Sequence, residues 1–332
     1  MTTTPMTLEE IHDLAHGCLS ANGTDSRNAD AISRNMTNAE RDGSHSHGLF
    51  RLPAHIASLR SGKIRGDADP KVSRITESLL KLDGDGGFAP LAQEIGIPVL
   101  AEAARAQGVA VLAMQRVHHM AALWPEVEAL ADQGLVGLAC TPYMPAVAPA
   151  GATKPLFGTN PIAFAWPRPG QAPAVFDMAT ASMAMGEVQI AAREGYHVPA
   201  GTGLDRNGKP TTDPAAIADG GVLLPFGGYK GSAIAMMVEL LAAGLVGENF
   251  SFEAKEGDNG DGGPPRGGEF ILALDPARIA GAGWAEHCEV FFSRYTDLEG
   301  VRLPGARRHH NRQDSGPRAI NTALVEKIRS LM

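Results

Sequence analysis

The stretch Arg41-Asp42-Gly43-Ser44-His45-Ser46-His47-Gly48-Leu49-Phe50-Arg51 places hydroxyls, two imidazoles and a guanidinium between two helix-like segments. Gly43 and Gly48 allow the backbone to bend sharply around the histidines. If the segment after Gly48 is helical, Arg51 lies one turn after His47 on the same face and could hold a small carboxylate beside a proton-donating imidazole. The alternative is a capped loop whose Ser and His side chains bond the nearby backbone. Because functional groups concentrate on rigidly supported loops, we favour the functional interpretation.

Helices are predicted on both sides of this stretch. Thr7-Leu8-Glu9-Glu10 is a capping box that opens a helix to about Ser20. A second helix begins at Ser26, and a third covers about 49–60 with Pro53 in its first turn. Further along, hydrophobic patterns predict strands near 77–83, 108–114, 136–140, 162–166, 174–177 and 269–275. They also predict helices near 90–107, 120–132, 182–193, 229–245, 276–294 and 319–332, with a mobile acidic loop over 253–268.

The composition limits the class of protein. A chain of 332 residues with 44% hydrophobic and 20% charged residues is typical of a soluble globular protein of one large or two moderate domains. The net charge of −8 argues against nucleic acid as a main partner. Three cysteines without metal-type spacing indicate reduced thiols in the cytoplasm. The N-terminus has no signal-peptide pattern, and the most apolar stretch, 231–247, is too short to span a membrane.

One segment fits the loose dinucleotide fingerprint G-x-G-x-x-G/A, namely Gly84-Asp85-Gly86-Gly87-Phe88-Ala89. Mostly helical sequence precedes it, and the later strands are short and unevenly spaced. A tight strand-to-helix turn explains the same glycines equally well. A Rossmann fold is therefore the less favoured interpretation.

Three segments carry groups that suit a phosphate. His118-His119-Met120-Ala121-Ala122-Leu123-Trp124 follows a strand and opens a helix with free N–H groups, although it could also be a loop anchored by the Trp. No third histidine or carboxylate stands at helical spacing, so no metal site is predicted. Gly227-Gly228-Tyr229-Lys230-Gly231 combines glycines, a helix start and a lysine, although it could be a plain helix start. Leu303-Pro304-Gly305-Ala306-Arg307-Arg308-His309-His310 is a basic patch that could grip phosphate or simply be solvated.

Other polar groups are weaker signals. Phe157-Gly158-Thr159-Asn160-Pro161 is a compact turn that carries a hydroxyl and an amide. Asp177-Met178-Ala179-Thr180 follows soon after it. Glu187, on a helix, could orient an imidazole by accepting its N–H, whereas a lone helix carboxylate is usually solvated.

Together these stretches resemble the malate/L-lactate dehydrogenase-like oxidoreductases, a nicotinamide-dependent family with its own non-Rossmann fold. The pieces that match, in the order of the family, are Ser46-His47-Gly48, Phe157-Gly158-Thr159-Asn160-Pro161, Gly227-Gly228-Tyr229-Lys230-Gly231 and Leu303-Pro304-Gly305. Within the family, the segments 119–125 and 186–192 are most similar to NADPH-dependent reductases of delta-1-piperideine-2-carboxylate and delta-1-pyrroline-2-carboxylate, which are cyclic imino acids.

The resemblance implies an α/β fold with a mixed or antiparallel sheet and a helical domain built from both termini. Residues 1–66 would form the helical N-terminal part of a catalytic and dimerisation domain. Residues 67–300 would form the domain that binds cofactor and substrate, and residues 301–332 would return to the helical domain. A homodimer with the active site near the subunit interface is implied as well.

The resemblance also implies roles for individual residues. His47 would be the proton donor, with Ser46 and Glu187 completing a catalytic relay. The substrate would contact Arg51, Thr159, Met185 and Gly186. The cofactor, NADPH or alternatively NADH, would contact His119, Met120, Ala121, Ala122, Leu123, Asp177, Met178, Ala179, Tyr229, Lys230, Leu303, Pro304, Gly305, Ala306, Arg307, Arg308 and His309. Met185 replaces a basic residue expected in the imine reductases, and Tyr229 replaces a frequent His.

We therefore expect a reductase that adds hydride from NADPH to C2 of a cyclic 2-imino acid and forms L-pipecolate or L-proline. A malate- or lactate-type 2-hydroxy acid dehydrogenase using NAD(P) is the alternative, because the same residues would protonate a carbonyl oxygen. A non-catalytic binder would bind cofactor without turnover. A hydrolase built on Ser46 and His47 is least favoured, because neighbouring residues rarely point at each other.

Overall fold

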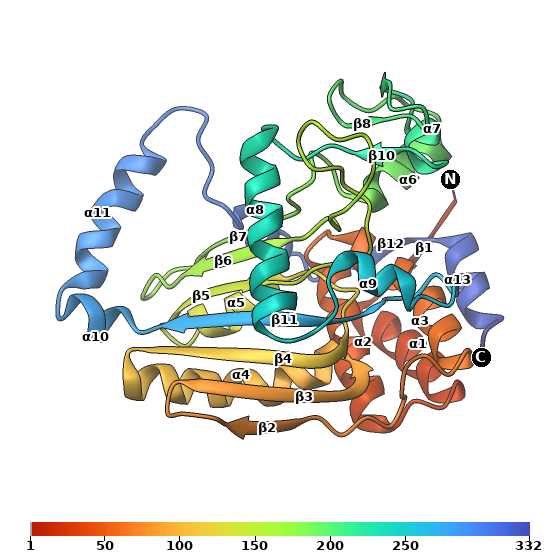
Figure 1. Cartoon of the computed structure of the whole chain (residues 1–332). Coiled ribbons are helices and arrows are strands. Elements are labelled where there is room, and N and C mark those ends of the chain that lie inside the picture. Colours follow the sequence, from red (N-terminus) through yellow and green to blue (C-terminus); the bar gives the residue numbers. More distant parts are fainter. Residues whose placement is uncertain (1) are drawn as a thin grey trace.

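A mixed seven-stranded sheet forms the centre of the computed structural model, which describes residues 2–332 (Figure 1). Its strands, in spatial order, are β2 (Lys71–Arg74), β3 (Leu79–Phe88), β4 (Val109–His118), β11 (Arg266–Leu274), β5 (Val136–Cys140), β6 (Ile162–Trp166) and β7 (Ala174–Met178). Only β3 and β4 pair in parallel, and every other neighbouring pair in this sheet is antiparallel. The mixed sheet confirms the predicted fold class.

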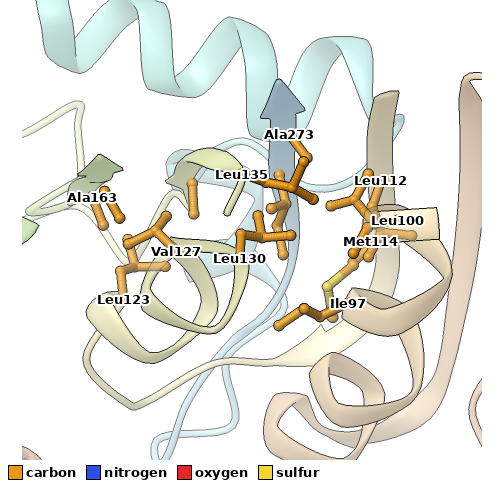
Figure 2. Close-up of a cluster of buried hydrophobic side chains, with 14 of the residues drawn as sticks. Ile97, Leu100, Leu112, Met114, Leu123, Val127, Leu130, Leu135, Ala163 and Ala273 are labelled. Atoms are coloured by element: carbon orange, nitrogen blue, oxygen red, sulfur yellow. The ribbon is translucent and has the colours of Figure 1, made fainter. Parts of the chain in front are cut away.

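Helices cover both faces of this sheet. On one face, α4 (Ala89–Gln107) and α5 (Trp124–Ala131) pack on the strands through a cluster that includes Leu100, Leu112 and Leu130 (Figure 2). On the other face, α8 (Tyr229–Glu239) continues as a π-helical segment, Leu240–Leu245, and buries apolar side chains against β11 and β5. Each fully buried leucine contributes roughly 1.5–3 kcal/mol. These two layers fix the ends of the strands, where the functional residues lie.

The two ends of the chain share a helical layer. Its elements are β1 (Thr3–Met6), α1 (Leu8–Ala21), α2 (Ser26–Arg41), α3 (Leu52–Arg60), β12 (Arg318–Asn321) and α13 (Thr322–Arg329). β1 pairs with β12, and Ile11, Ile32 and Ile328 belong to one buried cluster. The predicted capping box is present, because Thr7 and Glu10 bond each other's backbone N–H. The helical domain from both termini is confirmed, while the boundaries at residues 66 and 300 stay predictions.

The glycines of the fingerprint segment do not form a turn into a helix. β3 runs through them to Phe88, with a shift of register between Asp83 and Gly87 in its pairing with β4. Asp85 and Gly86 have positive φ values of 54° and 73° inside this bulge. The glycines therefore serve a bulged strand, and our prediction of a tight turn was wrong.

Other predicted boundaries also differ. The third helix begins at Leu52 instead of 49, after two short 3₁₀ turns, and the helix predicted at 120 begins at Trp124. The helix predicted from 182 is α6 (Met185–Glu194), and 319–332 starts as a strand. The predicted loop 253–268 contains part of α9 (Ser251–Glu256) and the start of β11. The remaining elements are α7 (Pro214–Ala218), α10 (Pro276–Ala280), α11 (Trp284–Thr296), α12 (Ala306–Asn311), β8 (Gly203–Leu204), β9 (Pro210–Thr211) and β10 (Val222–Leu223).

The helices of the described chain, residues 2–332, are too short or too polar to cross a lipid bilayer.

Candidate active site

A buried glutamate at the end of α2 shapes the turn that follows. Glu40 Oε1 accepts a hydrogen bond of 2.9 Å from the backbone N–H of Leu49, and Glu40 Oε2 lies 2.5 Å from His45 Nδ1. A Cβ atom added to Gly48 would lie 2.1 Å from Glu40 Oε1, so only glycine fits there. Sequence reasoning missed Glu40, because its contacts run across the turn and not along a helix face.

Ser46, His47 and Arg51 come together at this turn as predicted. Ser46 Oγ lies 3.1 Å from His47 Nδ1, so these neighbours do point at each other, and our argument against a hydrolase on that ground was wrong. Arg51 Nε donates to the carbonyl oxygen of Ser46 at 2.7 Å. Among residues 2–332, no carboxylate forms an ion pair with Arg51. The turn therefore holds a guanidinium whose charge no carboxylate of residues 2–332 matches.

Burial controls the protonation of this group. Burial, and then the charges of Arg51 and His119, lower the pKa of His47 to about 3. Burial also lowers the pKa of Arg51, which nevertheless stays a cation because guanidinium ionises so strongly. At neutral pH the site therefore combines a neutral imidazole with a fixed positive charge.

The start of α6 lies against this turn. A Cβ atom added to Gly186 would lie 3.3 Å from Arg51 Nη2 and 3.7 Å from the Cβ of Ser46. The next residue, Glu187, is exposed and forms no hydrogen bond with Ser46 or His47 in the described part of the chain. The structure thus places Gly186 near Arg51, the cation predicted to bind the substrate. Met185 precedes it as the first residue of α6, and its substrate contact and the relay through Glu187 stay predictions.

The predicted turn 157–161 reaches the same place through Tyr143. Asn160 is buried and has a positive φ of 38°. Its side-chain N–H donates a hydrogen bond of 2.8 Å to Glu239 Oε1, and its side-chain oxygen accepts one of 3.3 Å from the N–H of Tyr143. Burial raises the pKa of the Tyr143 phenol, and the charge of Arg51 opposes this, so the phenol and the guanidinium interact. The turn therefore fixes half-buried Thr159 beside the Tyr143 segment. Tyr143 carries no sequence signal and was missed.

The predicted cofactor segment 119–123 is a loop and not the first turn of a helix. The N–H groups of Leu123 and Trp124 both donate to Asp177 Oδ2, at 2.8 and 3.1 Å. These donors, which we expected to be free for a phosphate, are already used by a carboxylate of this chain. The contact instead joins the 119–123 loop to the end of β7, where Asp177, Met178 and Ala179 lie.

The C-terminal basic segment meets the same place. Pro304 accepts a hydrogen bond of 3.1 Å from the N–H of Val175, and Arg308 Nη2 donates 2.9 Å to the carbonyl of Val175. The Arg308 guanidinium lies 5.0 Å from the centroid of the Trp124 ring. Three of the predicted cofactor segments, 119–123, 177–179 and 303–309, therefore lie side by side.

Cations near this junction fit an anionic dinucleotide. Arg308 Nε is buried without a hydrogen-bond partner in residues 2–332, and Arg307 is exposed. Tyr229 and Lys230 are exposed at the start of α8, after Gly227 and Gly228, whose φ values are positive. The N–H of Phe226 donates a hydrogen bond of 3.0 Å to the carbonyl oxygen of Thr180, so α8 starts close to the end of β7.

A second buried cluster lies beside His119. Its Nε2 is 3.3 Å from Glu126 Oε1, and Gln93 connects Glu126 to Glu269. The sequence did not indicate this cluster, because Gln93, Glu126 and Glu269 come from three separate elements. Our prediction of no metal site considered only carboxylates and histidines at helical spacing, whereas the fold brings Glu126 and Glu269 beside His119.

The chain belongs to the malate/L-lactate dehydrogenase family, whose sequence signature matches residues 6–329. It is thus an oxidoreductase that depends on a nicotinamide cofactor. A more specific class is indicated by a Delta(1)-pyrroline-2-carboxylate/Delta(1)-piperideine-2-carboxylate reductase of Pseudomonas syringae pv. tomato, which is 47% identical over 98% of this chain and 94% of its own. The crystal structure of delta1-piperideine-2-carboxylate reductase from that organism has a TM-score of 0.94 at 46% identity, over 99% of this chain and all (100%) of the other. A (2R)-3-sulfolactate dehydrogenase (NADP(+)) of Chromohalobacter salexigens is 41% identical over 98% of this chain and 97% of its own.

Proposed function

We propose that this protein reduces cyclic 2-imino acids with NADPH, converting delta-1-piperideine-2-carboxylate to L-pipecolate and delta-1-pyrroline-2-carboxylate to L-proline. The observation that carries the proposal is the half-buried Arg51, which has no carboxylate partner among residues 2–332, beside the Ser46–His47 pair. The similarity to the Pseudomonas syringae reductase supports this choice of substrate.

Arg51 binds the substrate carboxylate in this proposal. A half-buried guanidinium without a counter-ion is partly desolvated, and a carboxylate matches its geometry with two parallel hydrogen bonds. Since Nε already donates to Ser46, the terminal N–H groups remain for the ligand. Gly186 keeps the space beside Nη2 free, because a side chain there would start 3.3 Å from that atom.

His47 holds the proton for the imine nitrogen. When bound, the nicotinamide supplies the hydride that C2 accepts, and the nitrogen gains one proton. A Ser46 hydroxyl that donates to Nδ1 leaves the proton of His47 on Nε2. Because the charge of Arg51 lowers the pKa of His47, a carboxylate bound to Arg51 offsets that charge and raises the pKa of His47 in the complex. Substrate binding thereby prepares the imidazole to carry and donate a proton.

NADPH is the proposed cofactor because cations lie at the junction of β7, the 119–123 loop and the 303–309 segment. Arg307 is exposed there, and the Nε of Arg308 is buried without a hydrogen-bond partner among residues 2–332. Lys230 is exposed at the nearby start of α8. A homodimer is supported by apolar side chains that α8 and its continuation expose, such as Met236, Leu240 and Leu245. The proposed partners are small carboxylates, and neither nucleic acid nor a membrane is proposed as a partner. The proposed location is the cytoplasm.

A 2-hydroxy acid dehydrogenase is the second candidate, because a sulfolactate dehydrogenase is among the similar proteins. The discriminating experiment measures initial rates with two cyclic imines, pyruvate, oxaloacetate and sulfopyruvate, each with NADPH and NADH. We expect the highest kcat/KM for an imine with NADPH. Slow imine reduction together with fast reduction of a 2-keto acid would assign the second function.

A further inference from the structure

Four buried polar side chains form a cluster behind the 119–123 loop. Glu269 is fully buried, and Glu126, Gln93 and His119 are 1%, 4% and 7% exposed. Glu126 lies on α5, Glu269 on β11 and Gln93 on α4. No part of the proposed reaction uses the two carboxyl groups, yet they lie beside a histidine whose charge reaches His47.

The hydrogen bonds of the cluster leave two oxygens without partners. Gln93 Nε2 lies 2.5 Å from Glu126 Oε1 and 2.9 Å from Glu269 Oε2, so one amide bridges both carboxyl groups. Glu126 Oε2 and Glu269 Oε1 have no hydrogen-bond partner among residues 2–332. In the same part of the chain no lysine or arginine forms an ion pair with either group, and His119 is the one basic neighbour of Glu126.

Two carboxylates cannot both stay ionised in such surroundings at little cost. An unpaired buried carboxylate is so unfavourable that the group takes up a proton instead. Burial raises the pKa of Glu126 and of Glu269 to about 8, and the charge of Glu126 adds to the effect on Glu269. Burial lowers the pKa of His119 instead. At neutral pH the proton therefore lies on a carboxyl group and not on the imidazole. In water the imidazole has the higher pKa, so the cluster reverses the two groups' relative affinities for a proton.

We propose that Glu126, Glu269 and Gln93 form a proton-holding unit that keeps His119 neutral and fixed in position beside the active site, and that loss of its proton weakens binding of the anionic substrate. The three residues are buried and act through His119 as positioning residues.

The charged neighbours of the unit favour this arrangement. From β7, the carboxylate of Asp177 disfavours ionisation of Glu126, and from β5 the pKa of Cys140 is raised by burial and by the charge of Glu269. From the active-site side, His47 and His55 both respond to the charge of His119. A neutral His119 thus leaves the positive field of Arg51 as the main field at the site. An ionised pair would oppose that field and repel a carboxylate ligand.

The protonation state is measured first on the free wild-type protein. Infrared spectra at about pH 7 should show the carbonyl stretch of a buried protonated carboxyl group, which disappears above about pH 9. Glu126→Gln and Glu269→Gln mimic the protonated form, and each should weaken this band. Glu128→Gln is the matched control, because Glu128 lies two residues away on α5 but is paired with Arg312. The control should keep the band.

Stability and kinetics give two further readouts. The folded protein binds this proton up to about pH 8 while the unfolded chain releases it near its usual pKa, so wild-type stability should fall as the pH rises between about 4.5 and 8. Both Gln variants should show a smaller fall. If only the proton-holding form binds substrate, KM rises about tenfold one pH unit above the pKa of the pair. Either Gln variant should reduce this rise and keep turnover at neutral pH, whereas Glu128→Gln should keep the full rise.

The kinetic part rests on the proposed function, but the infrared and stability parts do not. A wild-type protein without the carboxyl band at about pH 7 would overturn the proposal. One equivalent of a divalent metal that copurifies with the wild type and is lost in Glu126→Gln would overturn it in favour of a metal site, because one donor atom each from His119, Glu126 and Glu269 lie within 4.8 Å of one another. Loss of turnover at neutral pH in both Gln variants, with their folding intact, would show that the ionised carboxylates are required. A normal band in a protein that reduces no imine would instead refute the proposed function alone.

Discussion

Two half-buried arginines near the end of α2 show how a charge withdrawn from water can serve either structure or ligand binding. Arg312 donates to Asp42 at 2.6 Å and to Glu128 at 2.6 Å, and Asp42 is also bonded by Arg41. Within residues 2–332, Arg51 donates to one backbone carbonyl, that of Ser46, and to no carboxylate. Although burial acts to lower the pKa of both guanidinium groups, the two carboxylates raise that of Arg312, whereas that of Arg51 stays lowered. A matched charge ties segments of the chain together, and an unmatched one is available to an anion.

The largest expected effect comes from removing the unmatched cation. Arg51→Met should lower kcat/KM for the imine about a hundred- to a thousandfold, because truncating one partner of a buried charge pair costs about 2–5 kcal/mol. The same change should leave the thermal midpoint unchanged or raise it, since an unpaired, half-buried charge disappears. Steady-state kinetics and thermal unfolding of the same sample check both parts.

Arg51→Lys is the control for charge without geometry. Lysine keeps the positive charge but not the planar fork, so we expect an intermediate loss of kcat/KM. A protein that loses much stability in Arg51→Met, or keeps wild-type kcat/KM, would contradict the division between the two arginines.

The matched arginine should behave in the opposite way. Arg312→Met leaves Asp42 and Glu128 buried with fewer partners, and breaking such a pair costs about 3 kcal/mol or more. Arg206, whose ion pair with Asp219 is exposed, gives the matched control, because exposed pairs contribute little. Urea unfolding of Arg312→Met and Arg206→Met makes the comparison. Equal losses in the two variants would show that the buried network has no special weight.

The sequence was most informative where function depends on neighbours in the chain. Ser46, His47 and Arg51 lie within six positions, so their proximity could be predicted before the fold was known. The capping box at Thr7 and Glu10 and most of the buried strands were found for the same reason, since local spacing decides them.

Residues that meet only through the sheet could not be predicted. β11 lies between β4 and β5, and this position lets Glu269 bond Gln93, which also bonds Glu126, across more than a hundred residues of chain. Glu40 and Tyr143 act through the shape of a turn and through burial, neither of which leaves a pattern in the residues. The bulge at Gly84–Gly87 has the composition of a turn, because both need positive φ values.

The buried histidines and the paired carboxylate of Asp42 should affect the free energy of unfolding in different ranges of acid pH. Burial lowers the pKa of His47 to about 3 and those of His55 and His118 to about 4, so the folded chain keeps all three neutral. The unfolded chain protonates them near about 6.5, so the free energy of unfolding should fall as the pH drops from about 6.5 towards 4. The pKa of Asp42 is lowered by Arg312 and Arg41 against the opposing effect of burial. Its contribution is therefore lost only at lower pH.

His47→Gln tests this assignment. It should make the pH dependence shallower by about 1 kcal/mol per pH unit between about pH 6 and 4.5, measured by urea unfolding. His287→Gln, at an exposed position of α11, should leave the slope unchanged. The same slope in His47→Gln and in the wild type would show that His47 is not neutral in the folded protein.

The smallest effect is expected for an arginine that is unmatched but exposed. Arg307 has the charge of Arg51 without its burial, so water and salt screen it, and Arg307→Ala should raise the KM for NADPH only about three- to tenfold. The KM for NADH should stay within about twofold, because the loss is specific to the additional phosphate if Arg307 contacts that group. Arg302→Ala, at another exposed position before the same segment, should change neither value. Higher ionic strength should reduce the difference between Arg307→Ala and the wild type, because screening removes what the mutation removes. If Arg307→Ala weakened NADPH binding as much as Arg51→Met lowers imine turnover, the exposure of an unpaired arginine would not determine how much it contributes to ligand binding in this protein.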